Sequence, residues 1–478
     1  MNENKRLIEE AFSHIKPVEI SEVDQLIEKQ LQALNKKIIV LDDDPTGVQT
    51  VHGISVYTDW SEDSLEKGFA EENSMFFILT NSRGFTTDET EKAHQEIAAN
   101  IVRVAKKNNQ DFTIISRGDS TLRGHYPLET KVLKETVEAS SNNRFDGEVI
   151  IPFFKEGGRF TIDNVHYVQM DEYLVPAGET EFAKDRTFGY TRSHLGEYAE
   201  EKSQGEYKAA DMTYITLESL RNLDIETIEQ QLLEVENFNK VIVNAVDYVD
   251  VKIFVIALVR AMNKGKNFMF RSAAALTKVI GGVTDKALLT REELVSEDSN
   301  HGGLVIVGSH VKKTTEQLEE LKKSDALEFI EFNVHLVLDP QAFEHELDRV
   351  VQETNGLICE GKNVAVYTRR ERLDLGENKK EEELKLSVQI SDAVTSIVQR
   401  LEVKPNFIIA KGGITSSDIG TKGLEVQRAT VAGQVRPGIP VWTTGTESKF
   451  PGMAYVIFPG NVGTKTDLRE VVEMLSKK

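Results

Sequence analysis

Short apolar runs alternate with amphipathic segments along most of this chain, and this alternation predicts its architecture. The runs are rich in β-branched and aromatic residues and are bounded by turn residues, which is typical of buried strands. The segments between them carry apolar residues at helical spacing. Buried strands that alternate with amphipathic helices build a mainly parallel sheet with helices on both faces. We therefore predict an α/β fold.

The pattern divides into two halves. In the first we expect strands at residues 38–41, 54–57, 75–80, 113–115, 149–153, 241–245 and 267–271, with helices at 88–108, 128–139 and 251–263. In the second we expect strands at 304–308, 330–333, 363–368, 407–410, 441–443 and 453–458, with helices at 314–322, 341–355 and 381–401. The segment 284–303 is charged and rich in turn residues, so we interpret it as a linker. The charge-rich stretch 369–385 is expected to form a solvated loop and a helix start.

This division predicts two α/β domains, at 37–283 and 304–478, with mainly parallel sheets flanked by helices and a ligand cleft between them. Residues 1–36 carry apolar residues at helical spacing and are expected to form a helical N-terminal prefix. Ser21 and Asp24 have the spacing of a capping box, which predicts that a helix starts there. The prefix either packs on the first domain or serves as an oligomerisation arm.

Composition and charge narrow the function classes. The 478 residues carry a net charge of −21, which disfavours binding to nucleic acid or to an anionic membrane surface, because both are polyanions. The single cysteine, Cys359, excludes an internal disulfide and fits a reducing compartment. The first residues lack the pattern of a signal peptide, and no apolar run approaches the roughly 18–20 residues needed to span a bilayer. We therefore expect a soluble, cytoplasmic protein.

Two polar loops follow expected strands in the first 125 residues and hold most of the candidate chemistry. One places Asp42, Asp43 and Asp44 before Pro-Thr-Gly, and the other spans residues 116–125. In an open α/β sheet, ligands bind beyond the carboxyl ends of the strands, where these loops would lie. Arginine forks bind carboxylate or phosphate, and aspartates accept hydrogen bonds from hydroxyls. This composition suits a polar, hydroxylated and anionic small molecule.

Structural alternatives exist for both loops. Asp-Pro-Thr-Gly is ordinary turn chemistry, and Asp44 could cap a helix. Arg117 and Asp119 could form an internal ion pair, while His125 could simply start a helix. For the loop with three aspartates, the functional interpretation is favoured because a turn needs one aspartate rather than three. Two weaker candidate loops, at 81–84 and 155–159, also follow apolar runs and add basic residues at what could be the same sheet edge.

The second half offers loops of a different kind. Gly308 and Ser309 precede an expected helix, whose N-terminus could hold a phosphate or could simply be capped. Residues 411–418 combine a lysine, two glycines and hydroxyls, which suits a nucleotide phosphate or ribose, and residues 458–463 form a third turn. Neither of the two commonest glycine-rich phosphate loops occurs. The scattered histidines argue against a structural zinc site.

These loops resemble the motifs of the four-carbon acid sugar kinase family. The family's Asp-Asp-x-Thr-Gly loop is matched from Asp43 to Gly47, and its most specific motif, Ser-x-x-Asp-Ser-Thr-x-Arg-Gly-His, is matched from Ser116 to His125. Further matches from both halves are Asn81, Arg83, Gly158, Arg159, Thr161, Gly308, Ser309, Thr314, Gln317, Gly412, Gly413, Thr415 and Ser416. The resemblance covers residues 37–470.

The resemblance implies that the N-terminal domain binds a sugar acid, that the C-terminal domain binds ATP with Mg²⁺, and that a phosphoryl group is transferred in the cleft between them. The implied substrate contacts are Arg83, Arg117, Asp119, Ser120, Arg123, His125, Gly158 and Arg159. The implied nucleotide contacts are Ser309, Lys411, Gly412, Gly413, Ile414, Thr415 and Gly460. In this assignment Arg117 and Arg123 hold the carboxylate, and Asp119 and Arg83 order the hydroxyls. Asp43 or Asp44 accepts the hydroxyl proton or holds the metal.

Two alternatives stay open. The family usually carries Lys-Ser-Gly-Asn-Phe-Gly near its end, where this chain has Phe-Pro-Gly-Asn-Val-Gly at 458–463 and so lacks a lysine that could contact a phosphate. This difference keeps a non-catalytic protein that senses a sugar acid or nucleotide on the same scaffold in consideration. The second alternative is a kinase for another polyol. We expect small-molecule partners, no nucleic acid and no membrane, and we leave a homodimer open.

Overall fold

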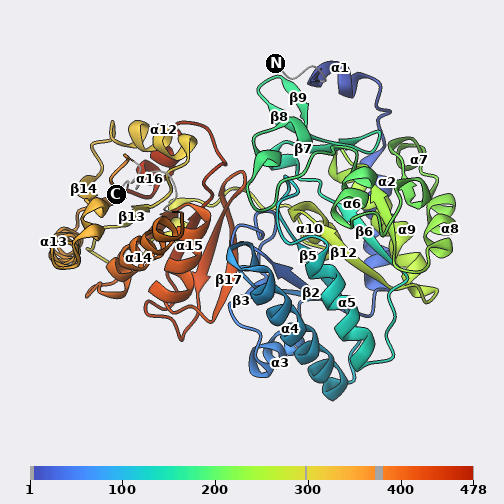
Figure 1. Ribbon diagram of the computed structural model, residues 1–478, viewed down its shortest axis with the longest axis horizontal. Helices are drawn as coiled ribbons and strands as arrows, with labels where there is room; N and C mark the ends of the chain where they lie inside the picture. The colour runs from blue at the N-terminus through green and yellow to red at the C-terminus, as the bar shows by residue number, and fades with distance from the viewer. Residues whose placement is uncertain (1–4, 297–298, 372–379, 477–478) are drawn as a thin grey trace. The chain divides into compact units, whose positions relative to one another are not determined.

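The computed structural model describes residues 5–296, 299–371 and 380–476. The chain forms two compact units, one ending at Asp285 and the other beginning at Lys286 (Figure 1). Each unit is built around a sheet with helices on both faces, which confirms the predicted α/β fold. The ligand cleft expected between the domains stays a prediction.

The first unit contains a sheet whose paired strands all run parallel. Its strands lie in the order β10-β11-β6-β12-β5-β2-β4-β3. They are β2 (Lys37–Asp42), β3 (Ser55–Tyr57), β4 (Met75–Leu79), β5 (Phe112–Arg117), β6 (Gly147–Ile151), β10 (Thr213–Ile215), β11 (Asn239–Val243) and β12 (Phe268–Ser272). Strand β2 is buried along its whole length, because it pairs on both sides and helices cover both faces.

Three helices pack on one face of this sheet: α3 (Glu62–Ala70), α4 (Thr87–Asn108) and α5 (Leu128–Ser140). Figure 1 shows α4 and α5 side by side. Thr86 and Glu89 form a capping box that fixes where α4 begins. A second group lies around α9 (Tyr248–Asn263) and comprises α2 (Ile20–Gln32), α7 (Leu217–Arg221), α8 (Ile225–Glu234) and α10 (Ala274–Ile280).

A four-stranded antiparallel sheet, in the order β1-β9-β8-β7, completes the first unit. Its strands are β1 (Arg6–Leu7), β7 (Arg159–Ile162), β8 (Val165–Met170) and β9 (Tyr173–Pro176). This sheet was not predicted from the sequence, because its strands are only two to six residues long. It packs with α6 (Leu195–Lys202) against the loop that follows β5.

The N-terminal segment contains β1, α1 (Ile8–Ser13) and α2, which buries Val23 and Ile27. The predicted capping box at Ser21 and Asp24 is not formed. Helix α2 begins at Ile20 without a side-chain cap, and Asp24 instead lies 2.6 Å from Lys252 Nζ on α9. No helix in the described part of the chain is long and apolar enough to cross a membrane.

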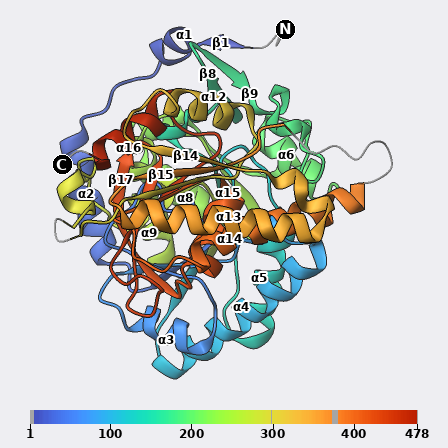
Figure 2. The same cartoon turned by 90° about the vertical axis from the view of Figure 1, so that its left-hand side faces the viewer.

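The second unit has a mixed sheet in the order β17-β18-β19-β16-β13-β15-β14. The strands are β13 (Leu304–Val307), β14 (Glu328–Phe332), β15 (Val364–Thr368), β16 (Ile408–Lys411), β17 (Arg428–Arg436), β18 (Ile439–Thr444) and β19 (Ala454–Phe458). β17 and β18 add an antiparallel hairpin to an otherwise parallel sheet. Helices α12 (Lys312–Leu321) and α16 (Asp467–Ser476) pack on one face. Figure 2 shows α13 (Pro340–Cys359) beside α14 (Lys380–Gln399), which contacts α15 (Gly413–Asp418).

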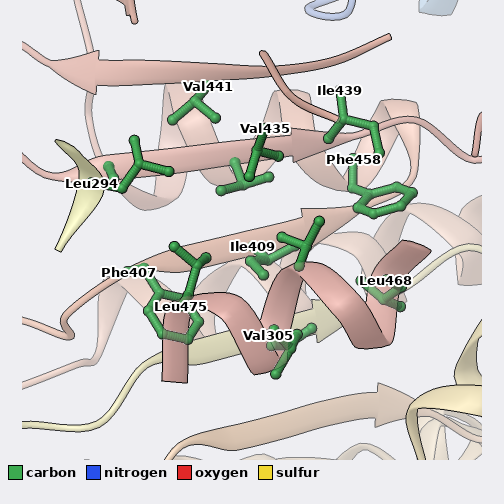
Figure 3. Packing of buried hydrophobic residues seen from close by; sticks show 14 of the residues in the cluster. Leu294, Val305, Phe407, Ile409, Val435, Ile439, Val441, Phe458, Leu468 and Leu475 are labelled. Atoms are coloured by element: carbon green, nitrogen blue, oxygen red, sulfur yellow. The ribbon is translucent and has the colours of Figure 1, made fainter. Parts of the chain in front are cut away.

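The expected linker at 284–303 contributes to the core of the second unit. Leu289, Leu294 and Val295 are buried in the same cluster as Val435 and Phe458, as Figure 3 shows for Leu294. A short helix, α11 (Arg291–Leu294), forms there. Apolar side chains spaced among charged ones therefore tie this part of the segment to the second sheet.

Both parallel sheets connect their strands in the same order. In the first, β2 is followed by β3 and β4 on one side, and the chain then crosses to β5 on the other side. In the second, β13, β14, β15 and β16 repeat this path. The order therefore reverses between β2 and β5, and again between β13 and β16. Ligands of open α/β sheets bind beyond the strand ends at such reversals.

Candidate functional site

Charged residues gather beyond the strand ends at the reversal in the first unit. We call this group the charged site; its members are Asp42, Asp43, Asp44, Arg83, Arg117, Asp119, Arg123, Glu129, Arg159 and Arg271. They come from the loops after β2, β4 and β5, from α5, from the start of β7 and from the end of β12. Parallel pairing brings these strand ends to one edge of the sheet, which is why residues far apart in sequence meet.

Arg83 binds both aspartates that follow β2. Its Nη2 and Nε lie 2.6 and 3.1 Å from the two carboxylate oxygens of Asp43, and its Nη1 lies 3.1 Å from Asp44 Oδ2. Burial raises the pKa of Asp43 although Arg83 opposes the shift. Burial acts in the same direction on Asp44, but Arg83 and hydrogen bonds from Thr46 outweigh it and lower the pKa of Asp44. Two adjacent carboxylates therefore differ in their affinity for a proton.

Asp44 also serves the turn that the sequence suggested, because its Oδ1 accepts the Thr46 backbone N–H at 2.8 Å. The turn and the ion pair with Arg83 exist together, so the structural and functional interpretations of this loop do not exclude each other.

Arg117, at the end of β5, pairs with the aspartate at the end of the adjacent strand. Its Nη1 lies 3.1 Å from Asp42 Oδ1 and 3.7 Å from Asp43 Oδ1. Burial raises the pKa of Asp42 to about 7, despite the opposing charge of Arg117. The internal pair that we considered between Arg117 and Asp119 is therefore replaced by a pair across two strands.

Asp119 pairs with Arg123 within the loop after β5. Arg123 Nε lies 2.7 Å from Asp119 Oδ2, and the Thr121 hydroxyl donates to the same oxygen. Burial acts to raise the pKa of Asp119, but Arg123 and Arg83 dominate and hold it well below its usual range. Asp119 is therefore an ionised hydrogen-bond acceptor.

Three side chains that the sequence analysis missed hold the backbone of this loop. His166 Nε2 lies 2.8 Å from the Ser120 carbonyl, Tyr190 donates to the Thr121 carbonyl at 2.7 Å, and Tyr198 donates to the Leu122 carbonyl at 2.9 Å. Burial lowers the pKa of His166 to about 4, so its imidazole is neutral. The loop geometry is thus fixed by the small sheet and by neighbouring segments.

Arg271 and Glu129 are further members that the sequence analysis did not select. The guanidinium of Arg271 pairs with Glu129 and donates to Ser116 Oγ at 3.0 Å. It passes so close to the chain that a Cβ at Gly124 would lie 2.6 Å from its Nη2. Arg271 ends a predicted strand, and a cation at the end of a strand is the sequence feature that could have identified it as a site residue. Only the strand order places it beside β5.

Arg159 differs from the other arginines of the charged site. Arg83, Arg117, Arg123 and Arg271 each form an ion pair, but no carboxylate among the described residues pairs with Arg159. Arg159 is 9% exposed, and its Nε, like that of Arg117, is buried without a hydrogen bond. Its guanidinium lies 5.8 Å from the ring centroid of Phe182.

The remaining predicted substrate contacts take structural positions nearby. His125 Nε2 lies 3.0 Å from the Phe85 carbonyl, and its ring meets Phe188 edge-on just before α5. Ser120 is buried, and its carbonyl is the one held by His166. Gly158 ends the 3₁₀ turn that leads into β7. The substrate roles assigned to these three residues stay predictions.

In the second unit, the loops after β13, β16 and β19 meet at the corresponding reversal. We call Gly308, Ser309, Gly412, Thr415 and Gly460 the glycine site. A Cβ at Gly412 would lie 2.8 Å from Ser309 Cβ, and one at Gly460 would lie 3.5 Å from Ser309 Oγ. Gly412 also has a φ of 121°, which side-chain-bearing residues rarely adopt. Glycine backbone and hydroxyl groups therefore form these three loops.

The other predicted nucleotide contacts flank the glycine site. The ammonium of Lys411 is buried, donates to the Pro459 carbonyl and lies 4.2 Å from the ring centroid of Phe458. Lys411 therefore supports the turn that carries Gly460, and its nucleotide role stays a prediction. Gly413 begins α15, and Ile414 is 72% exposed.

The carboxylates of the charged site suit a metal ion that is bound mainly by the phosphate oxygens of a small-molecule ligand, with few contacts to the protein. No group of three or more histidine, cysteine or acidic residues in the described ranges could hold a metal ion. Mg²⁺ commonly binds through one or two carboxylates together with phosphate oxygens. Asp44, ionised and more exposed than Asp43, has the chemistry for one such contact.

Comparison with known protein families shows which family this chain belongs to. The sugar-binding N-terminal domain family matches residues 38–280, and the nucleotide-binding C-terminal domain family matches residues 304–468. The chain belongs to the four-carbon acid sugar kinase family. The charged site lies within the residues matched by the sugar-binding domain, and the glycine site lies within those matched by the nucleotide-binding domain.

Solved structures show the same fold at low identity. A Haemophilus influenzae protein is 16% identical, with a TM-score of 0.58, over 91% of this chain and 100% of its own. A Salmonella typhimurium LT2 protein, provisionally described as a tRNA synthase, is 15% identical, with a TM-score of 0.62, over 91% of this chain and 98% of its own. No protein with curated annotation matches the sequence.

Proposed function

We propose that this protein is an ATP- and Mg²⁺-dependent kinase that phosphorylates a hydroxyl of a small sugar acid, most simply a four-carbon tetronate or 3-oxo-tetronate. The observation that carries the proposal is the charged site, in which buried arginines and aspartates lie together in a domain of a sugar-binding family. A glycine site in a domain of a nucleotide-binding family supplies the second half.

Arg159 is the best candidate to bind the substrate carboxylate. A buried guanidinium without an anionic partner is costly, and a bound carboxylate would remove this cost. Arg117 and Arg123, to which the sequence analysis assigned the carboxylate, already pair with Asp42 and Asp119. Arg123 still lies close to the same Phe182 ring, 5.1 Å from its centroid, and would contribute a second, weaker contact.

The two aspartates after β2 suit different tasks. A carboxylate with a raised pKa accepts a proton more readily than one with a lowered pKa, which favours Asp43 over Asp44 as the general base. Asp43 would accept the hydroxyl proton as the hydroxyl oxygen attacks the γ-phosphorus and ADP leaves. Asp44 stays ionised and would contact the metal. Ionised Asp119 and Arg83 would orient the hydroxyls of the sugar.

The nucleotide would bind at the glycine site through backbone groups and the Ser309 and Thr415 hydroxyls. When bound with the nucleotide, Mg²⁺ would neutralise charge on the phosphate oxygens. Since phosphoryl transfer depends mainly on positioning and charge stabilisation, the protein's contribution is to hold both ligands in place.

The direct test is an ADP-release assay with Mg-ATP and a panel of tetronates, 3-oxo-tetronates and uncharged polyols. Turnover of an acid but not of the matching uncharged polyol is the expected result. Turnover restricted to uncharged polyols would favour the polyol kinase. If the protein binds ATP and a sugar acid but turns over neither, it would be the non-catalytic sensor.

A matched pair of variants tests the carboxylate assignment. Arg159→Ala should raise the KM for the acid by about 10-fold or more and leave the KM for ATP unchanged, because a charge-assisted contact is lost. Lys155→Ala removes an exposed cation that pairs with Asp247 at 2.6 Å, and it should change neither constant. Equal KM values for Arg159→Ala and the wild type would refute the assignment.

A further inference from the structure

A single arginine after β15 lies against the glycine site. Arg370 Nη2 donates to the Ser309 carbonyl at 2.6 Å and to Thr315 Oγ1 at 2.8 Å. Residues 372–379 of the stretch that we expected to be a solvated loop lie outside the described residues. Arg370 is described, and it is half-buried rather than solvated.

The other nitrogens of this guanidinium lack acceptors. Nε and Nη1 of Arg370 are both buried without a hydrogen bond. No carboxylate among the described residues pairs with Arg370; burial lowers its pKa, and the more distant Glu319 only partly opposes the shift. A buried donor without an acceptor is unfavourable, and a guanidinium presents its N–H groups as a fork that matches phosphate oxygens.

The neighbouring arginine shows the contrast. Arg369 is 40% exposed, and its guanidinium already contacts Glu371 and Asn333. Lys411, the cation that the sequence analysis placed at this site, donates to the Pro459 carbonyl instead. Arg370 therefore lies beside Ser309 with two guanidinium nitrogens, Nε and Nη1, that have no hydrogen-bond acceptor.

We propose that Arg370 binds a phosphate group of the nucleotide, with Nη2 remaining on the Ser309 carbonyl while Nε and Nη1 donate to phosphate oxygens. This inference rests on the proposed binding of ATP by the second unit. It supplies the phosphate-binding cation that the loop at 458–463 lacks.

The test uses calorimetric titration of the full-length protein with Mg-ATP and three variants, each checked for folding by its thermal unfolding. Arg370→Gln removes the charge but keeps an amide that can donate to the Ser309 carbonyl. It should weaken ATP binding about 10- to 100-fold, because a charge-assisted hydrogen bond is lost. Arg370→Lys keeps the charge and should recover part of the affinity. Arg369→Gln, the matched control, should stay within about twofold of the wild type.

These titrations distinguish a failure of ATP binding by the protein from a failure of the role assigned to Arg370. If the wild type binds no Mg-ATP, the proposed function itself fails. If the wild type binds and Arg370→Gln binds equally well, only the role of Arg370 is refuted. If Arg370→Gln and Arg370→Lys lose affinity equally, Arg370 merely shapes the Ser309 loop, and the phosphate contact is likewise refuted.

Discussion

The charged site and the glycine site occupy the same position in two sheets that connect their strands in the same order, yet their chemistry is opposite. Beyond β2 and β5, buried carboxylates and guanidiniums pair with one another. Beyond β13 and β16, the loops carry glycines and hydroxyl side chains, so the backbone is not covered by large side chains. Under the proposed function, the shared strand order would determine where each ligand binds, and the loops would determine which ligand it is.

The difference has physical consequences for mutation. In the charged site, neighbouring groups balance the charges of buried side chains, so removing one leaves another buried and unpaired. In the glycine site, the loops approach one another closely because side chains are absent, so adding a side chain is the damaging change. Each prediction below tests one side of this comparison, beginning with the largest expected effect.

The first prediction concerns Asp43, the proposed proton acceptor of the charged site. Asp43→Asn should lower kcat by about 10²- to 10⁴-fold, the usual contribution of a general base, while ATP affinity stays within twofold. Asp44→Asn should instead raise the Mg²⁺ concentration needed for half-maximal activity. Steady-state kinetics with Mg²⁺ titration would measure both effects. A larger loss of kcat in Asp44→Asn than in Asp43→Asn would mean that Asp44, rather than Asp43, accepts the proton.

The second prediction concerns the buried pair of Glu129 and Arg271. Glu129→Ala should lower the free energy of unfolding by about 3–5 kcal/mol, because Arg271 is left buried and unpaired. Glu226→Ala removes an 82% exposed partner of Arg260 and should cost less than about 1 kcal/mol. Urea unfolding of both variants would measure the difference.

The same pair predicts a pH dependence with a defined sign. Burial acts to raise the pKa of Glu129, but the charge of Arg271 together with other neighbouring groups outweighs burial and lowers the pKa from its usual 4.5 to about 2. The stabilisation by ionised Glu129 is therefore complete above about pH 4.5 and is lost as the pH falls towards 2. Glu129→Ala should lack this part of the acid-induced loss. An identical pH profile in variant and wild type would contradict the pKa shift.

The third prediction concerns the glycine site. Gly412→Ala should weaken ATP binding by about tenfold or more, because an alanine is strained at a φ of 121° and its Cβ would collide with Ser309. Gly356→Ala, in the last turn of α13 with open space around its Cβ, should stabilise the protein by about 0.5–1 kcal/mol. Titration with ATP and thermal unfolding distinguish these results. Unchanged ATP affinity in Gly412→Ala would remove the glycine site from nucleotide binding.

The smallest effect is expected at Ile414, an exposed apolar residue at the start of α15. Ile414→Ser should change the free energy of unfolding by less than about 0.5 kcal/mol, because the side chain is mostly solvated. It should weaken ATP binding a few-fold if this side chain covers part of the nucleotide. Val388→Ser, at another exposed apolar position of the same unit, is the control and should leave ATP binding unchanged.

Buried parallel strands were the most predictable part of the fold. The strands predicted at 38–41 and 304–308 correspond to β2 and β13, because strands covered on both faces are continuously apolar. The small antiparallel sheet was missed because its strands are short. Helix α16 was missed although its buried residues Leu468, Val471, Val472 and Leu475 have helical spacing. The interpretation of 284–303 as a linker did not foresee that Leu294 is buried.

Within the candidate site, motif residues were easier to select than their partners. Asp43, Arg117 and Ser309 lie in recognisable loops, but nothing local connects Arg271 to Glu129 or Arg370 to Ser309. These contacts join residues that are distant in sequence. The roles assigned to the predicted site residues remain predictions, for which the variants above are the tests.

The sequence by itself determined the α/β class, the family and the loops that carry polar chemistry, because hydrophobic periodicity and local motifs are properties of neighbouring residues. Only the tertiary structure decided which charges neutralise one another. Four arginines of the charged site pair with carboxylates, three of them with a carboxylate outside their own loop, whereas Arg159 and Arg370 have no carboxylate partner among the described residues. The reason is physical: the energy of a buried charge depends on its neighbours in space, and strand order sets those neighbours.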